Sequence, residues 1–234
     1  MEYTKKTLKR IMKEIKILEN SREDLEKNGI HFFYDEDKLG TFYFLIVGVE
    51  GTPYEKGIYP FKMDIPFGFP FDPPSMKIIL PNDGHSRMNP NLYTNGKVCL
   101  SMINTWSGPG WLPSFTLEKV MVVTQALVMN EFPLINEPGH EKDSSSKLNE
   151  YNECVLHQNY ALAVIKMHQS RNDFCFKLFG EIINKLVLEN KDFYIEKLEE
   201  YVKVKTKKVF QEWTYHMKIS NRYNSMLKYI KTLE

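Results

Sequence analysis

Apolar residues in the first twenty positions recur at the spacing of an amphipathic helix. The positions that share one face over residues 3–20 are Leu8, Ile11, Met12, Ile15 and Leu18. Lysines and one arginine cover much of the remaining surface, and Asn20-Ser21 ends the pattern. We therefore predict an N-terminal helix that packs one apolar face on the rest of the domain.

Between residues 30 and 80 the pattern changes to short runs rich in β-branched and aromatic residues. These runs are IHFFYDE at 30–36, TFYFLIVGV at 41–49, GIYPFKMDI at 57–65 and MKIIL at 76–80. Each is bounded by Gly, Pro, Asn or Asp, which is typical of successive strands. Runs this close together leave no room for helical crossovers, so the sequence predicts a four-stranded antiparallel meander.

Two stretches are predicted to lack regular structure. Residues 66–74 contain four prolines, which remove backbone donors and fix φ, so this segment forms a shaped loop. Residues 81–115 are rich in Asn, Gly and Pro. A loop-rich region of that length inside a compact domain is typically functional.

Helical periodicity returns at Thr116 and dominates to the end of the chain. Thr116 is the expected cap of a helix that ends at Met129, and its apolar side comprises Leu117, Val120, Met121, Thr124 and Leu127. Further helices are predicted over 149–167 and 173–188, with one or two more over 193–231. The fold class is therefore α+β, with a domain over residues 1–165 and a helical C-terminal extension over residues 166–234.

Composition and charge narrow the classes of function. The 31 basic and 30 acidic side chains give a net charge of +1, which argues against a general nucleic-acid binder. The first residues lack the apolar core of a signal peptide, and the longest apolar run, Phe42 to Val49, is too short for a membrane span. We expect a cytoplasmic protein, with the nucleus as an additional compartment, and no nucleic-acid or membrane partner.

Apart from Cys99, the cysteines and the C-terminal aromatic residues are expected to have structural roles. Three widely spaced cysteines form no disulfide framework and no metal-binding pair, so we expect no metal and no cofactor. Cys154 and Cys175 lie on apolar faces of predicted helices and are expected to be buried thiols. In the tail, Trp213, Tyr215, Tyr223 and Tyr229 alternate with lysines as in some nucleic-acid binders, but Glu196, Glu199 and Glu200 favour an amphipathic helix packed on the domain.

Cys99 has two possible interpretations from its own neighbourhood. Lying between Val98 and Leu100, it could be a small buried hydrophobic residue, which is the common role of such a cysteine. It could also be a single nucleophilic cysteine. The histidine nearest in sequence is His85, so no Cys–His pair of the thiol-protease kind is indicated.

The residues around Cys99 carry a resemblance to a known family. Asn89-Pro90-Asn91, whose second asparagine precedes Cys99 by eight residues, resembles the His-Pro-Asn…Cys signature of ubiquitin-conjugating enzymes. The stretch GTPYEKGIYPFKMDIPFGFPFDPPSMKII, the run NGKVCL and Trp111-Leu112-Pro113-Ser114 are similar to the same family, in the same order, from about residue 5 to residue 138. The sequences NPN, KVCLS, NTWSGPGW, NEPG and YNECVLHQNYALAV most resemble the Z type of that family.

This resemblance implies the ubiquitin-conjugating fold, with an N-terminal helix, the antiparallel meander, an active-site loop and helices. It also implies that an activating enzyme transfers ubiquitin, or a ubiquitin-like protein, to Cys99 as a thioester in an ATP-dependent pathway. A substrate lysine, presented by a ligase, then attacks that thioester. A non-catalytic ubiquitin-binding relative is the alternative, although such relatives lack the cysteine. A thiol hydrolase would need a histidine base close to Cys99.

The resemblance assigns further residues to the site. Asn91 would be either an oxyanion donor or a turn residue whose side chain caps its own loop. Pro90 would shape the loop, and Asn89, at the usual histidine position, would be a structural hydrogen-bonding residue. Ser101 stands where the family often has Asp. Asn136 or Glu137 falls near the position of a residue that prepares the incoming lysine, and we take Asn136 as a supporting residue.

Two surfaces match the partner-binding positions of the family. The basic face of the N-terminal helix, formed by Lys5, Lys6, Lys9, Arg10 and Lys13, matches the site for the activating enzyme; it could equally be a solvated helix face. Phe71, Pro113 and Ser114 match positions that contact ligases. An exposed Phe71 between prolines would suit such a contact, whereas a buried one would plug the core.

Overall fold

Four antiparallel strands form the sheet on which the fold is built. The computed structural model describes residues 2–35, 38–173 and 176–234. The strands are β1 (Ile30–Tyr34), β2 (Thr41–Val47), β3 (Ile58–Asp64) and β4 (Ser75–Ile78), in the order β1-β2-β3-β4. The predicted meander is therefore confirmed, although Glu36, at the end of the first predicted run, lies outside the described residues.

Aromatic residues on alternating positions give this sheet a buried face. Phe32 pairs with Phe44, and Phe44 pairs with Phe61, so that the three rings cross the sheet side by side. The rings of Phe44 and Phe61 stack with their centroids 4.9 Å apart, and all three side chains are fully buried. Period-two alternation thus selects one face of the sheet for the core.

The N-terminal helix α1 (Lys5–Asn20) packs on this core as predicted, and Ile11, Ile15 and Leu18 of the predicted face are buried. Thr4 caps it by accepting the N–H of Thr7. The buried positions are Thr7, Ile11, Glu14, Ile15 and Leu18, whereas Met12 is 53% exposed, so its assignment to the apolar face was wrong. A short second helix, α2 (Arg22–Lys27), follows Ser21 and was not predicted.

The helix α3 (Leu117–Val128) confirms the predicted cap and corrects one packing position. Thr116 accepts the N–H of Lys119, which satisfies a donor at the first turn. Leu127 is 54% exposed and the adjacent Val128 is buried in its place. The segments 66–74 and 81–115 are irregular as expected, apart from the single turn η1 (Ser101–Ile103) and isolated bridges.

A long helix follows α3 and the short turn η2 (Pro133–Asn136). It begins as α4 (Ser145–Gln158), continues in π geometry as η3 (Asn159–Lys166) and ends as α5 (Met167–Gln169). Cys154 is fully buried on it, as predicted. The expected boundary between residues 165 and 166 lies inside this continuous helix.

The C-terminal part is only partly helical. After turns over residues 170–173 and 176–179, α6 (Gly180–Glu189) begins at Gly180 instead of residue 173, and Cys175 lies outside the described residues. Next come α7 (Lys191–Val204), the hairpin strands β5 (Val209–Gln211) and β6 (Lys218–Ser220), and α8 (Tyr223–Lys231). The expectation of helices throughout 193–231, and hence of an all-helical extension, was wrong for this hairpin.

The hairpin has a local physical cause. The carboxylate of Glu212 accepts the N–H groups of Thr214, Tyr215 and Met217, which ties the chain reversal together. Phe210 and Ile219 are paired across the strands and buried between exposed neighbours. That alternation follows the two-residue period of a strand.

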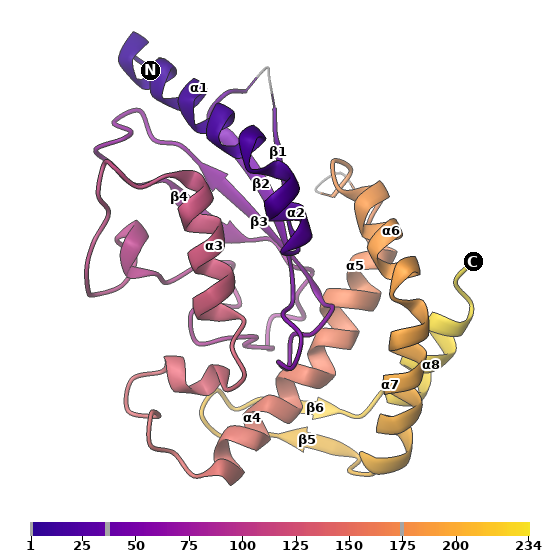
Figure 1. Ribbon diagram of the computed structural model, residues 1–234. Helices are drawn as coiled ribbons and strands as arrows, with labels where there is room; N and C mark the ends of the chain where they lie inside the picture. Colours follow the sequence, from indigo (N-terminus) through magenta and orange to yellow (C-terminus); the bar gives the residue numbers. More distant parts are fainter. Residues whose placement is uncertain (1, 36–37, 174–175) are drawn as a thin grey trace.

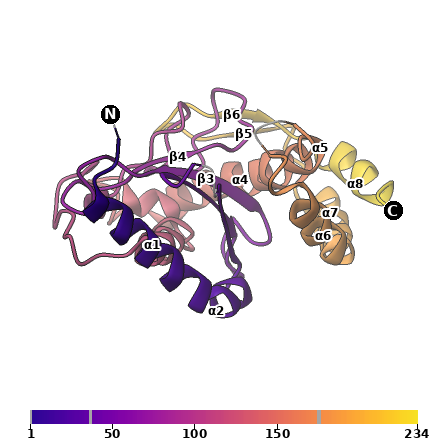
Figure 2. The same ribbon diagram turned by 90° about the horizontal axis from the view of Figure 1, so that it is seen from above.

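The C-terminal helices lie beside the sheet instead of forming a separate arm (Figures 1 and 2). Phe179, fully buried, meets the rings of Phe33 and Tyr43 at 4.7 and 6.0 Å. Phe33 and Tyr43 are a cross-strand pair that faces away from Phe32 and Phe44. The extension therefore covers part of the second face of the sheet. None of the helices in the described part of the chain has the length and apolarity needed to span a membrane.

Candidate active site

Cys99 lies where an irregular hairpin ends and the turn η1 begins. The hairpin is fixed by the bridge between Leu92 and Val98, and the backbone N–H of Cys99 donates to the carbonyl oxygen of Asn91 over 2.9 Å. The following residue is also fixed, because the hydroxyl of Thr105 hydrogen-bonds both the N–H and the C=O of Leu100. Cys99 itself is only 2% exposed.

Asn91 also donates a hydrogen bond to Cys99. Its side-chain amide donates to the carbonyl oxygen of Cys99 over 2.6 Å, and the side chain is half-buried. A primary amide carries two N–H donors. One of them fixes the backbone at Cys99, which leaves the second for another acceptor at the edge of the site.

Asn89 is fully buried and its amide is saturated with hydrogen bonds. Its nitrogen donates to the hydroxyl of Tyr54 and to the carbonyl of Val128, over 2.9 and 2.8 Å. Its oxygen accepts the N–H of Asn91 over 2.8 Å and an amide N–H of Asn136 over 3.4 Å. An amide in such surroundings holds the loop in shape and has no basic lone pair to offer.

Tyr54 supports this arrangement from the loop that precedes β3. Its hydroxyl donates to the carbonyl of Met88 over 2.7 Å, and its side chain is fully buried. Burial raises the pKa of Tyr54 far above its ordinary value, so the hydroxyl keeps its proton and remains a donor. The sequence analysis did not identify this residue as part of the site.

Arg87 is a second residue that the sequence analysis missed. Its guanidinium donates to the carbonyls of Asn89 and Pro90, over 3.2 and 2.7 Å. Pro90 is buried and lacks a backbone N–H, so its carbonyl is its one polar link to this arginine. No local pattern around Arg87 marks it, because its partners Tyr215 and Met217 lie far along the chain.

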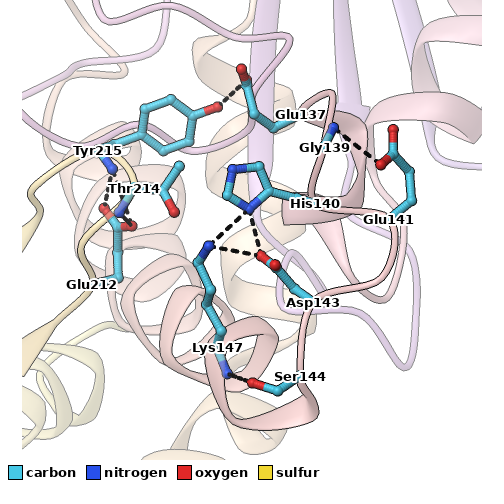
Figure 3. A network of polar contacts seen from close by, with 10 residues as sticks. All are labelled: Glu137, Gly139, His140, Glu141, Asp143, Ser144, Lys147, Glu212, Thr214 and Tyr215. Atoms are coloured by element: carbon cyan, nitrogen blue, oxygen red, sulfur yellow. Dashed lines mark hydrogen bonds and ion pairs between the residues drawn. The ribbon is translucent and has the colours of Figure 1, made fainter.

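Asn136 and Glu137, the two candidates for a residue that prepares the lysine, have different partners. Asn136 donates to the carbonyl of Leu127 over 2.8 Å as well as to Asn89, so it joins the end of α3 to the Asn89–Asn91 loop. Glu137 instead accepts the hydroxyl of Tyr215 over 2.5 Å (Figure 3). Burial, and then the Glu137 carboxylate, raise the pKa of Tyr215, so its hydroxyl stays protonated.

Ser101 begins η1 and is half-buried. Gly108 lies against it: a Cβ at this glycine would come within 3.1 Å of the Ser101 Cβ, and its φ of 132° also favours glycine. Across this loop, the Asn104 side chain accepts the backbone N–H of Trp111 over 2.8 Å. The segment between residues 101 and 111 is therefore folded back on the turn that follows Cys99.

The expected ligase-binding residues are brought together at one edge. The indole N–H of Trp111 donates to the carbonyl of Pro70 over 2.7 Å and so joins the two loops that carry them. Phe71 is 69% exposed, and Pro113 and Ser114 are exposed. Phe71 is thus an exposed aromatic residue and does not plug the core.

The basic residues of α1 divide into two groups. The exposed members are Lys5, Lys6, Lys9 and Lys13. Arg10 differs, because its guanidinium pairs with the buried Glu14 at 2.6 Å and donates to the carbonyls of Pro113 and Phe115 over 2.6 and 2.7 Å. Arg10 therefore joins α1 to the loop before α3.

The described residues give the Cys99 sulfur no histidine partner. His85 is exposed, and its backbone N–H donates to Asp83. Within residues 2–35, 38–173 and 176–234, the sulfur of Cys99 has no histidine hydrogen-bond partner. The same ranges contain no group of three His, Cys, Asp or Glu residues placed to hold a metal ion.

The family model "Ubiquitin-conjugating enzyme" matches residues 10–157. Ubiquitin-conjugating enzyme E2 Z of Xenopus tropicalis is 36% identical over 167 residues, which is 71% of this chain and 53% of that protein. Its Homo sapiens counterpart is 37% identical over 169 residues, 71% of this chain and 47% of that protein. The chain thus spans about half the length of the curated relatives it matches.

A solved structure also aligns. It is a Toxoplasma gondii ubiquitin-conjugating enzyme E2 domain, with a TM-score of 0.48 and 23% sequence identity. The alignment covers 66% of this chain and 97% of that chain.

Proposed function

The chain belongs to the ubiquitin-conjugating enzyme family, and from this we propose that Cys99 carries ubiquitin or a ubiquitin-like protein as a thioester. An activating enzyme would supply the modifier, and a substrate lysine presented by a ligase would receive it. The observation that carries the proposal is the pair of hydrogen bonds between Asn91 and Cys99, which ties an amide donor to the cysteine.

The chemistry suits a thiol carrier. The Cys99 thiolate attacks the thioester carbonyl on the activating enzyme, a new C–S bond forms, and the enzyme's thiolate leaves. One thioester replaces another, so this exchange is close to even in free energy. In the second step a lysine amine attacks, the C–S bond of Cys99 breaks and an amide forms, which runs downhill.

Asn91 would act in the second step. When the amine adds, the thioester oxygen becomes negative, and a fixed N–H donor stabilises that charge. One N–H of the Asn91 amide bonds the Cys99 backbone carbonyl, and the second would serve such an oxygen. Asn89 and Asn136 would support it, because they fix the loop on which Asn91 lies.

The burial of Cys99 adds a requirement to this function. A residue that is 2% exposed offers too little surface for a protein C-terminus to reach its sulfur. Loading therefore needs a local movement of the segment around Cys99, which includes Ser101 and the loop packed on it. Local opening of this kind is common for loops at binding sites.

Exposed residues on two surfaces would meet these partners. Lys5, Lys6, Lys9 and Lys13 would meet the activating enzyme, whereas the internal bonds of Arg10 place it in the fold rather than in this contact. Phe71, Pro113 and Ser114 would meet a ligase. Residues 1–165 would form the catalytic unit, with residues 166–234 as an extension packed on it.

A gel-based loading assay tests the proposal. The protein is incubated with activating enzyme, ATP and ubiquitin, or a ubiquitin-like protein, and then separated with and without reducing agent. We expect an adduct that reducing agent removes, which disappears in Cys99→Ala and persists in Cys154→Ala and Cys175→Ala. No adduct with any activating enzyme would refute the carrier function. Binding of ubiquitin without an adduct would favour a non-catalytic role, and cleavage of a ubiquitin ester would favour a hydrolase.

A further inference from the structure

The C-terminal hairpin reaches the loop that precedes the proposed catalytic cysteine. Its strands cross α4 in Figure 1, where His157 lies 5.4 Å from Phe210 between ring centroids. At the turn, the sulfur of Met217 accepts the backbone N–H of Arg87 over 3.3 Å. The ring of Tyr215 lies 5.0 Å from the guanidinium carbon of the same arginine. Arg87 and Met217 are thus in contact although they lie 130 positions apart in the sequence.

Arg87 is held on its other sides as well. Its guanidinium carbon lies 3.5 Å from the ring centroid of Tyr93, a position in which a cation attracts an aromatic face. Its carbonyl accepts the hydroxyl of Tyr151 over 2.7 Å. The side chain therefore lies between Tyr93 on the active-site hairpin and Tyr215 on the C-terminal hairpin, which leaves its donors aimed at the carbonyls of Asn89 and Pro90.

The C-terminal hairpin binds the opposite border of the site through the same tyrosine. The hydroxyl of Tyr215 donates to Glu137, the residue that follows Asn136 (Figure 3). Its ring lies 5.0 Å from the guanidinium carbon of Arg87 and 5.9 Å from the ring of Tyr151. The turn that presents Tyr215 is tied by Glu212, which accepts its N–H over 3.0 Å. One side chain thus connects the two segments that border Asn89.

We propose that Arg87 is a positioning residue, held by Tyr215 and Met217 of the C-terminal hairpin, that fixes the Asn89–Asn91 loop and so aims Asn91 at Cys99. This inference rests on the proposed function of Cys99 and Asn91. It makes residues 209–220 part of the catalytic unit, although the family match ends at residue 157. The extension would then set the rate of transfer to lysine without touching the thioester.

The arginine has a chemical requirement that lysine cannot meet. A planar guanidinium donates two directed hydrogen bonds to adjacent carbonyls while its faces stack on aromatic rings. An ammonium group keeps the charge but loses both the fork and the stacking plane. Arg87→Lys is therefore the informative change, since it preserves charge, length and burial of the stem.

The test separates loading from discharge in single-turnover assays. We expect Arg87→Lys to load Cys99 within about twofold of the native rate, and to discharge to free lysine about tenfold more slowly, a change of about 1.4 kcal/mol in the barrier. Tyr215→Leu, which removes both the ring and the hydroxyl, should slow discharge in the same direction. Trp213→Ala, at a 67% exposed position of the same turn, is the matched control and should discharge at the native rate. Thermal unfolding of every variant establishes that the fold is retained.

A double-mutant cycle distinguishes positioning from a general loss of structure. If Arg87 acts through Asn91, then Arg87→Lys changes discharge less than twofold in an Asn91→Ala background. Fully additive effects of the two substitutions would overturn the proposal. It would also be overturned if the single variant Arg87→Lys discharged within twofold of the native rate. Should Arg87→Lys fail to fold, the same cycle is run with Tyr215→Leu. Failure of the unmodified protein to load at Cys99 would instead refute the carrier function itself.

Discussion

The side-chain amide of Asn91 lies 2.6 Å from the carbonyl oxygen of Cys99, and the backbone of Cys99 in turn donates to the carbonyl of Asn91. Each residue therefore fixes the other across the hairpin that the Leu92–Val98 bridge closes. This reciprocal pairing accommodates both roles that the sequence left open for Asn91. One N–H holds the Cys99 carbonyl, and under the proposed function the other would stabilise a developing oxyanion.

Asn91→Ala separates these roles by kinetics. We expect thioester formation at Cys99 to continue, because loading needs the thiolate and not the amide. Discharge to lysine should slow by roughly 10²–10³, the effect of removing one oxyanion donor in other enzymes. Rapid-quench assays of the two half-reactions measure both rates. Discharge at the native rate would limit Asn91 to a structural role, and Thr94→Ala, at an exposed position of the same hairpin, serves as the control.

Asn89→Ala should reduce the stability of the fold. The substitution leaves the carbonyl of Val128 and the N–H of Asn91 without their buried partner. An unsatisfied buried polar group costs about 1–3 kcal/mol, so we expect the free energy of unfolding to fall by at least about 2 kcal/mol. Urea denaturation gives this value, and Thr94→Ala should differ from the native protein by less than about 0.5 kcal/mol. A loss for Asn89→Ala no larger than that of the control would contradict the network.

Phe179→Ala tests the packing of the extension on the sheet. This side chain is fully buried against Phe33 and Tyr43, and removal of a buried phenylalanine costs about 3–5 kcal/mol. Its neighbour Leu178 is 55% exposed, so Leu178→Ala should change stability by less than about 1 kcal/mol. Both are measured by urea unfolding with near-ultraviolet circular dichroism. Equal small losses for the two variants would show that the extension does not stabilise the sheet.

His157 gives the stability a defined dependence on pH. It is fully buried, its Nε2 accepts the backbone N–H of Arg222 over 3.0 Å, and burial lowers the pKa of its imidazole to about 4. The unfolded chain takes up a proton near the ordinary value of 6.5. Between these two pH values the unfolded state binds more protons than the folded state, so stability is lost as pH falls. His157 alone should remove about 2 kcal/mol between about pH 7 and pH 5.

The variant His157→Gln isolates this contribution. Its side-chain oxygen can accept the bond from Arg222, but it has no proton to gain above pH 4. Burial also lowers the pKa of His31 and of His168. The pH dependence of stability that these two histidines contribute remains in the variant. Urea unfolding at several pH values should therefore give a curve for His157→Gln that is flatter by about 2 kcal/mol over the same window. Parallel curves would show that His157 is not held neutral in the fold.

Elements that depend on local signals were predictable from the sequence. The four strands follow from short alternating runs between turn residues, and Thr116 marks the start of α3 because a cap needs only its own first turn. Which individual positions of a helix are buried was harder to predict from the sequence. Glu14 is buried where Met12 was expected, because the carboxylate pairs with Arg10 and accepts the N–H of Leu117, a residue of another helix.

The residues that the sequence concealed have distant partners. The hairpin over 209–220 mixes apolar and polar residues without a long strand-like alternation, and its position depends on contacts with Arg87 and Tyr151. Arg87 in turn lies next to the recognisable Asn89–Asn91 segment but carries no motif of its own. Its contacts with Tyr215 and Met217 exist only after the chain has folded.

The exposed lysines of α1 lead to a prediction about loading. Positive charge on this face would speed the encounter with an acidic surface of an activating enzyme, and such steering weakens with salt. We expect the double variant Lys5→Glu/Lys9→Glu to load several-fold more slowly at about 50 mM salt, with a smaller difference at about 300 mM salt, measured as initial thioester rates. Discharge from loaded Cys99 should be unchanged, because α1 contributes none of the hydrogen bonds around Asn91.

The matched control reverses two exposed lysines elsewhere, Lys203→Glu/Lys228→Glu, and so changes the net charge equally. If this control slows loading as much as the α1 variant, the effect belongs to total charge and the α1 surface has no special role.

Arg10→Ala should behave differently from both double variants. Its bonds to Glu14 and to the carbonyls of Pro113 and Phe115 are internal, so its loss should lower the stability of the protein as well as the loading rate. A slow but fully stable Arg10→Ala would instead place this arginine in the contact with the activating enzyme.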